Sequence, residues 1–177
     1  SMNLIAKVIQ KATQEQPHIH FHLHSGNFKY VSDMINSGKV EFGIVVGQNH
    51  LEDFDFMPLS VYEHWGIYIP KDDPLSSNEH ITPNDVKGLP LIISNQDMIS
   101  SKFHGWAFIN KEPLNRVATY NLINNGLLLV KNHVGYCIGL ENISCVQDDS
   151  ICFKRLYPPL IDQTMVIWKK YHSLSKE

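Results

Sequence analysis

The sequence predicts an α/β fold made of two similar lobes. Residues 1–47 run in the order helix, strand, helix, strand, which is typical of α/β proteins. The pattern then repeats, because residues 27–46 and 121–140 both pass from a turn through a helix to a buried strand. β-like runs near residues 54–70 and 164–170 follow the two copies. The final strand of each half can therefore cross into the other lobe.

The repeat sets the expected domain boundaries. Its copies lie at a constant offset of 94 residues, with few identities, so the similarity is one of pattern. The polar, turn-rich stretch 71–78 is the best candidate for a linker. We expect lobe I over residues 1–71 plus 163–177, lobe II over residues 72–162, and a ligand cleft between them.

The first two elements have clear periodicities. Residues 3–15 place apolar side chains on one face and polar ones opposite, which predicts a helix that Pro17 ends. Residues 18–24 alternate between apolar side chains and four histidines. Period two predicts a strand, and its polar face predicts a place at a sheet edge or with one face open.

The repeat unit itself is easy to delimit. Asn27 precedes a helix with Phe28 and Ile35 turned inward, and Gly38 suits the C-terminal cap of that helix. Residues 40–47 are almost all apolar, which predicts a central parallel strand.

Residues 82–85, Thr-Pro-Asn-Asp, are typical of a helix start, with Thr as the N-cap and Pro in the first turn. The remaining expected elements are strands at 54–59, 65–70, 89–94, 117–120, 134–140, 151–156 and 164–170, and helices at 100–110 and 122–132.

Composition excludes several classes of protein. The chain has 177 residues and a formal net charge of −3, and only Arg116 and Arg155 are arginines, which argues against direct nucleic-acid binding. It is shorter than the roughly 250 residues of an eight-fold β/α barrel. No run approaches the ~20 apolar residues of a membrane span. The three cysteines, Cys137, Cys145 and Cys152, lack a C-x-x-C spacing, so we expect a reducing, cytoplasmic setting.

The histidine ladder His18, His20, His22 and His24 is the most conspicuous local feature. Metal-dependent hydrolases use H-x-H on a strand, but the other histidines here lack ligand spacing, so we expect no metal and no cofactor. The chain also lacks a G-x-S-x-G elbow, a P-loop and a G-x-G-x-x-G motif, so we expect no catalytic residues and no enzyme. An exposed or partner-covered face is favoured, and coverage by a second subunit would make association sensitive to pH.

The expected ends of the parallel strands carry small or hydrogen-bonding residues. In open α/β sheets ligands bind at these ends, and helix N-termini there suit a carboxylate or another anion. Each such residue could also serve only as a helix cap. Because several ends would meet in one cleft, we expect a small-ligand site formed by Ser25, Gly26, Asn27, Gly47, Ser94, Asn95, Gln96, Tyr120, Asn121 and Ile138.

Several segments together resemble the effector-binding domain of LysR-type transcriptional regulators. Residues 17–21 resemble its first P-x-V-x-[FL] segment, residues 25–27 its G-[TN] turn, and residues 35–44 its G-x-[LV]-[DE]-[FL]-G-I segment. Residues 70–75 are similar to its D-H-P-L linker, with Asp73 in place of His. The strand at 89–92 and the segment 125–136 complete the resemblance, although residues 132–133 stand where one glycine is usual.

The resemblance implies a type 2 periplasmic-binding-protein fold, with two Rossmann-like lobes joined by two crossover strands. It implies a small effector, carboxylates among the candidates, in the interlobe cleft. It also implies promoter binding through a winged helix-turn-helix, for which we expect no counterpart in this chain. We expect no membrane attachment either, because no apolar run is long enough to span a bilayer. By the same resemblance, we expect the family's first strand to be missing ahead of Asn3. Head-to-tail dimerisation is implied through the first helix and the following strand, at Leu4, Lys7, Lys11, His18, His20 and His22.

Two alternatives remain open at this point. A free-standing solute-binding protein would have the same fold, and an export signal would favour it. A metal-dependent hydrolase would need stoichiometric metal on the histidine ladder.

Overall fold

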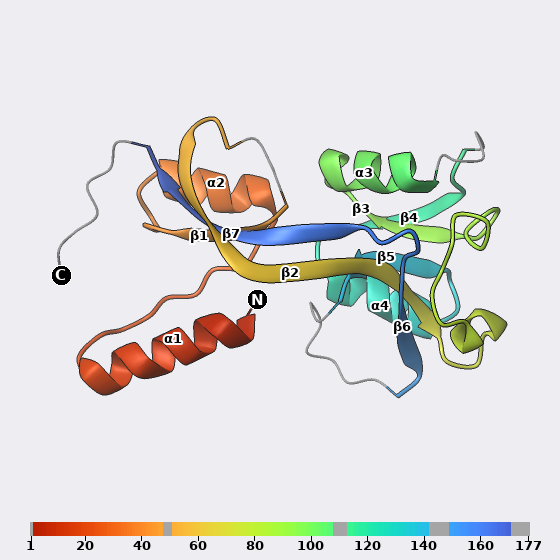
Figure 1. Cartoon of the computed structure of the whole chain (residues 1–177), viewed down its shortest axis with the longest axis horizontal. Helices are drawn as coiled ribbons and strands as arrows, with labels where there is room; N and C mark the ends of the chain where they lie inside the picture. The colour runs from red at the N-terminus through yellow and green to blue at the C-terminus, as the bar shows by residue number, and fades with distance from the viewer. Residues whose placement is uncertain (1, 48–50, 108–112, 142–148, 171–177) are drawn as a thin grey trace. The chain divides into compact units, whose positions relative to one another are not determined.

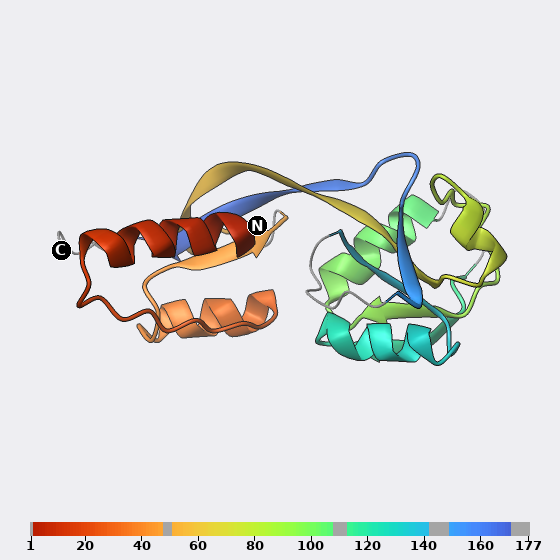
Figure 2. The same cartoon turned by 90° about the horizontal axis from the view of Figure 1, so that it is seen from below.

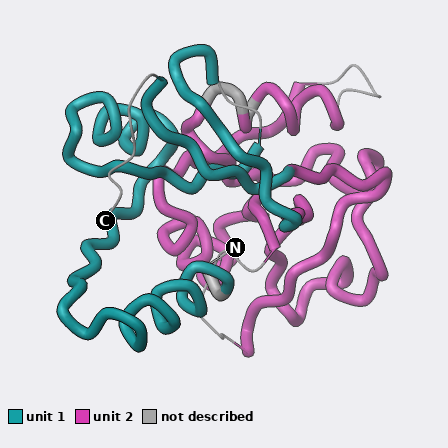
Figure 3. Tube along the Cα trace, turned by 60° about the vertical axis from the view of Figure 1, so that its left-hand side comes forward, with its two compact units in different colours: residues 1–61, 163–177 teal, residues 62–162 magenta. Residues whose placement is uncertain are grey.

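The computed structural model describes residues 2–47, 51–107, 113–141 and 149–170. The chain divides into two compact units, residues 1–61 with 163–177 and residues 62–162 (Figure 3). Two long strands, β2 (Phe54–Pro70) and β7 (Ile161–Lys169), each pass from one unit into the other (Figure 1).

The boundary along β2 lies at residue 61, ten residues before the expected end of lobe I. Residues 65–70 pair antiparallel with β5 (Tyr136–Leu140) and β6 (Ile151–Arg155), both of which lie in unit 2. The two expected strands at 54–59 and 65–70 are therefore one strand, and its second half belongs to the second unit.

Unit 1 contains α1 (Met2–Glu15), α2 (Phe28–Asn36) and β1 (Gly43–Val46) beside parts of β2 and β7. Helix α2 packs on one face of the strands (Figure 2). The core between them consists of Ile35, Val45, Phe54, Met165 and Ile167. Both helices were expected, and Gly38, with φ of +68°, occupies the left-handed position after α2, as predicted.

The strand predicted over residues 18–24 is wrong for this structure. The segment begins in a turn at residues 17–18 and has no ladder partner among the described residues, and Ile19, Phe21 and Leu23 are 37%, 43% and 64% exposed. Alternation makes a segment suitable for a strand, but a strand also needs a neighbour that takes its backbone hydrogen bonds.

The predicted central parallel strand is also wrong. β1 pairs antiparallel with β7 and stands at the end of the strand order. Among the described residues, α2 covers one face of β1, while Phe42 and Ile44 are 47% and 36% exposed. A continuous apolar run therefore does not distinguish a doubly buried strand from an edge strand with an uncovered apolar face.

Unit 2 contains three parallel strands, β3 (Leu91–Ser94), β4 (Arg116–Tyr120) and β5, in the order β5-β3-β4. Helices α3 (Asp97–Ala107) and α4 (Ile123–Lys131) follow β3 and β4, and the short 3-10 helix η1 (Pro74–Ser77) precedes β3. Part of the expected helix 100–110 lies outside the described residues. One core cluster consists of Tyr68, Ile92, Leu127, Val130 and Cys137.

The internal repeat is present in the backbone. α2 begins at Phe28, and 94 residues later is position 122, one residue before α4 begins. β1 ends at Val46, and 94 residues later is Leu140, where β5 ends. Each helix is followed by one residue of positive φ, Gly38 at +68° and His133 at +56°. The two helix–strand pairs are therefore built alike.

The helix predicted from residue 82 does not form. Thr82 donates from its backbone nitrogen and its hydroxyl to Asp85 Oδ2, at 2.7 and 2.6 Å, and only the first of these bonds is typical of a helix start. The chain makes only turns from residue 83 to Gly88, which has a positive φ of 72°. The nitrogen of Asp85 donates to the backbone carbonyl of Thr82, as in a turn, and the Thr82 hydroxyl donates to Asp85 instead of accepting from an N–H as an N-cap would. In the described part of the chain, no helix has the length and apolarity needed to cross a membrane.

Candidate ligand-binding site

The carboxyl ends of β3 and β4 lie side by side in unit 2. Ser94 is the register partner of Tyr120, and the backbone nitrogen of Asn95 donates to the carbonyl of Tyr120 at 2.8 Å. The structure thus brings residues 94–96 together with residues 120–121. We call these five residues, all of them predicted from the sequence, the strand-end cluster.

Ser94 is the buried member of the cluster. Its side chain is only 2% exposed, and its Oγ accepts a hydrogen bond of 3.3 Å from the backbone nitrogen of Gln96. Asn95 is exposed and Gln96 is half-buried. Ser94 therefore shapes the turn that leads into α3, while Asn95 presents its amide to solvent.

Tyr120, the last residue of β4, links the cluster to the neighbouring strands. Its hydroxyl donates to the carbonyl of Ile138 at 2.6 Å, which joins β4 to β5 across the central β3. Burial, followed by smaller contributions from Cys137 and Tyr68, raises the pKa of Tyr120 well above its ordinary value, so the phenol stays protonated. Ile138 itself is fully buried, and its carbonyl accepts the Tyr120 hydrogen bond, so its expected contact with a ligand stays a prediction.

Two helices begin immediately after the cluster. α3 starts at Asp97, directly after Gln96, and α4 starts at Ile123. Within the described residues, Leu122, the N-cap of α4, makes no side-chain cap bond, and Asn121 Oδ1 accepts a hydrogen bond from the nitrogen of Leu122 at 3.0 Å. No side-chain cap bond therefore competes for the first-turn N–H groups of α4, and these groups with the helix dipole favour an anionic or hydrogen-bond-accepting group.

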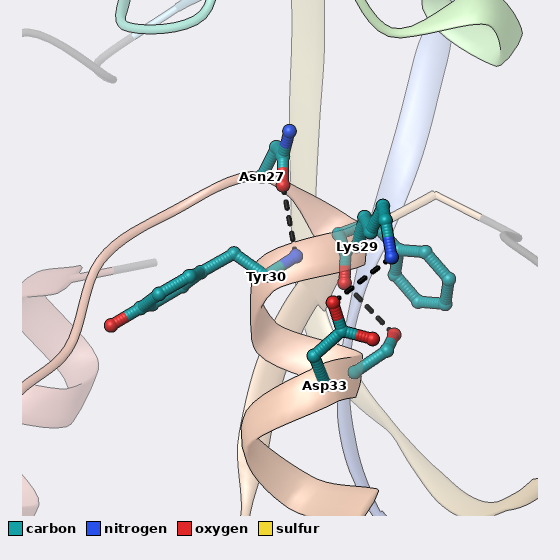
Figure 4. A network of polar contacts seen from close by, with 6 residues as sticks. Asn27, Lys29, Tyr30 and Asp33 are labelled. Carbon is teal, nitrogen blue, oxygen red and sulfur yellow. Dashed lines mark hydrogen bonds and ion pairs between the residues drawn. The ribbon is translucent and has the colours of Figure 1, made fainter.

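The remaining predicted residues lie in unit 1. Asn27 caps α2, since its Oδ1 accepts a 2.9 Å hydrogen bond from the nitrogen of Tyr30 (Figure 4). The amide nitrogen of Asn27 points away from that bond (Figure 4). Ser25 is exposed, and a Cβ on Gly26 would lie 2.4 Å from the Tyr30 ring. Gly26 is therefore required for the close approach of this turn to the helix.

Gly47 follows β1 in a left-handed conformation, with φ of +85°, and its nitrogen donates to the carbonyl of Gln163 at 3.0 Å. Side chains rarely adopt this φ, so glycine is needed here for the backbone alone. The structure thus gives Gly47 a conformational role beside any contact with a ligand.

Charged side chains contribute little to the strand-end cluster. Arg116 lies at the opposite end of β4, and Arg155 pairs with Glu141 at 2.7 Å. Within the described ranges, no three His, Cys, Asp or Glu side chains are grouped so that they could hold a metal ion. His18, His20 and His22 are exposed in the segment between α1 and α2. Backbone N–H groups and amides are therefore the polar groups that the cluster could offer to a ligand.

One polar network was not predicted. Asp162 accepts a 2.7 Å hydrogen bond from Trp65 Nε1 and forms an ion pair with Lys102 of α3. Asp162 and Trp65 are 97 residues apart in the chain, and no local motif links them. Only the crossing of β2 and β7 brings these side chains together.

The comparisons with known proteins agree on one family. The family model described as "LysR substrate binding domain" matches residues 1–177. The HTH-type transcriptional regulator SsuR of Burkholderia cenocepacia is 27% identical over 105 residues, which are 59% of this chain and 34% of that protein. The matched region thus spans about a third of the length of this curated relative.

Solved structures show the same fold. The effector-binding domain of QuiR in complex with shikimate matches with a TM-score of 0.82 and 18% identity, over 97% of this chain and 83% of that one. The regulatory domain of Synechocystis PCC6803 CcmR in complex with 2-PG matches with a TM-score of 0.81 and 11% identity, over 99% and 86%. At these identities the similarity establishes the fold alone.

Proposed function

Because the chain belongs to the LysR substrate-binding domain family, we propose that it binds a small polar metabolite through the strand-end cluster and Asn27. In the regulator of which it would form the sensing part, a winged helix-turn-helix would contact promoter DNA. The chain is an effector-binding domain by family. The family's role in transcription favours a regulatory ligand over a substrate that is converted.

The observation that carries this proposal is the pairing of two polar strand ends on parallel strands. Asn95 and Asn121 are both exposed there, and the uncapped start of α4 follows directly. Open α/β sheets bind ligands at this position because small residues, amides and helix N-termini converge there. A carboxylate suits the helix N-terminus, and hydroxyls on the same ligand suit the two amides.

Asn27, Ser25, Gly26 and Gly47 would supply the contacts from unit 1. A ligand that binds groups in both units favours the arrangement in which both sets of contacts are made. We propose that this closure changes the geometry of a dimer, and with it the spacing of the DNA-binding heads.

The dimer would form through α1 and the segment 18–24. Leu4 and Val8 on α1 are 41% and 60% exposed, although they belong to the apolar face of that helix. Phe21 and Leu23 are exposed as well. A second copy would cover these apolar side chains, with Lys7, Lys11 and the histidines at the rim.

Thermal unfolding of the 177-residue chain with a panel of small carboxylates, beginning with shikimate, and their neutral analogues tests the ligand proposal. We expect at least one carboxylate to raise the melting temperature, and the rise to be smaller for Asn27→Ala and Ser94→Ala. Ser101→Ala is the matched control, since Ser101 is an exposed serine of α3. Equal stabilisation of all three variants would show that the assigned residues do not form the site.

A further inference from the structure

Asp162 connects three elements of unit 2 at the point where β7 leaves that unit. Its Oδ2 accepts from the indole of Trp65 on β2, and its Oδ1 pairs with Lys102 on α3. The Asp162 side chain is only 11% exposed and Trp65 only 4%, so water competes little for the hydrogen bond. The backbone nitrogen of Trp65 also donates to the carbonyl of Leu160 at 2.9 Å.

The next residue, Gln163, makes its contacts in unit 1. Its Nε2 donates to the carbonyl of Leu59 on β2 at 3.0 Å, and its own carbonyl accepts from Gly47 at 3.0 Å. Adjacent residues of β7 are therefore fixed to different units. On β2 the unit 1 anchor is Leu59, and the unit 2 anchors begin at His64, whose carbonyl accepts from the nitrogen of Glu141 at 2.8 Å. Residues 60–63 of β2 and the peptide 162–163 of β7 therefore lie between the two sets of anchors along the chain.

α3 connects this anchor to the strand-end cluster. The helix begins directly after Gln96 and carries Lys102 on its second turn. A helix moves as a rigid body over such a length, so a displacement of its first turn also displaces Lys102. Asp162 would transmit that displacement to both crossover strands.

We propose that Asp162 is a positioning residue, which couples α3 to β2 and β7 so that a ligand at residues 94–96 acts on the crossover through the Lys102 pair. The role of the ligand rests on the proposed function. The coupling itself is a property of the unliganded chain and is tested without any ligand.

The experiment is hydrogen–deuterium exchange of the 177-residue chain, read in peptides that cover residues 60–66 and 158–165. Asp162→Asn keeps an oxygen for Trp65 but removes the charge, and Lys102→Met removes the partner. We expect each to raise exchange in these peptides at least about threefold, as for the loss of a hydrogen bond to a charged group. β1 and β4 should keep their protection. Lys102→Arg keeps a cation that can pair with Asp162, so exchange in the crossover peptides should stay as in wild type.

The matched control is Lys29→Met, which removes an exposed Lys–Asp pair of 3.0 Å on α2. It should leave exchange at the crossover unchanged. Unaltered exchange there in both Asp162→Asn and Lys102→Met would overturn the proposal, as would a uniform rise throughout unit 2.

A double-mutant cycle separates coupling from simple structural support. Ser94→Ala loosens the turn before α3, and we expect it to raise exchange over residues 158–165 in the wild-type background but not further in Asp162→Asn. Additive effects would overturn the proposal. A failure of the carboxylate panel would contradict the proposed function and leave these exchange results unaffected.

Discussion

The side-chain oxygen of Asn27 lies 2.9 Å from the backbone nitrogen of Tyr30 and accepts its hydrogen bond. This bond satisfies one of the N–H groups that the first turn of α2 leaves without a helical partner. It occupies only the oxygen of the amide, so the NH₂ group can donate to a ligand at the same time. A cap and a ligand contact are therefore compatible in one residue.

Substitutions of Asn27 separate these two roles. Asn27→Ala should lower the free energy of unfolding by about 1 kcal/mol, the usual cost of losing an N-cap. Asn27→Asp keeps the cap but replaces the donor by a negative charge, so it should keep stability and lose the response to carboxylates. Urea unfolding and the thermal-shift panel measure the two effects. If Asn27→Asp responds to carboxylates as wild type does, Asn27 is only a cap.

Tyr120→Phe tests the support beneath the strand-end cluster. The substitution removes the 2.6 Å hydrogen bond to Ile138 and leaves a buried carbonyl without that donor. We expect a loss of about 1–3 kcal/mol in the free energy of unfolding. Tyr157→Phe is the control, because Tyr157 is 56% exposed and should change stability by less than ~0.5 kcal/mol. Equal effects of the two substitutions would show that the Tyr120 bond carries no special weight.

The sequence predicts most elements because their signals are local. The apolar stripe of α1, the Asn cap of α2 and the buried run of β3 each depend on residues within one or two turns of chain. The strand-end cluster follows from the same signals, since parallel strands place their carboxyl ends together.

The failures have the opposite cause. The segment 18–24 would form a strand only beside another strand, and β1 would be a central strand only if both of its faces were covered. The periodicity of a sequence does not show which neighbours a segment has. The Asp162–Trp65 bond depends on two strands that meet 97 residues apart in the chain. Such interactions depend on the topology of the sheet, so no local sequence pattern predicts them.

We expect the protonated side chain of Tyr136 to stabilise the fold, and this stabilisation to be lost in alkali. Burial, together with the 2.6 Å hydrogen bond to Asp73 Oδ2 and the charge of Asp73, raises the pKa of Tyr136 from 10.0 to about 12. The folded state therefore holds this proton more tightly than the unfolded chain does. The resulting stabilisation is complete below pH 10 and is lost as the pH rises towards about 12.

Tyr136→Phe removes this contribution. The difference in unfolding free energy between wild type and the variant, measured in urea from pH 8 to 12, should therefore shrink above pH 10. A difference that stays constant over this range would show that the proton of Tyr136 is not linked to folding.

Thr164→Val should stabilise the chain. Thr164 lies on β7 opposite Val46 and is fully buried, and its hydroxyl has no hydrogen-bond partner among the described residues. A buried hydroxyl without a partner costs free energy, and valine has nearly the same shape without that cost. We expect a gain of about 1 kcal/mol in urea unfolding. Thr119→Val on β4 is the control, because Thr119 is exposed. A loss of stability in Thr164→Val alone would mean that the hydroxyl is satisfied in solution, by a buried water for example.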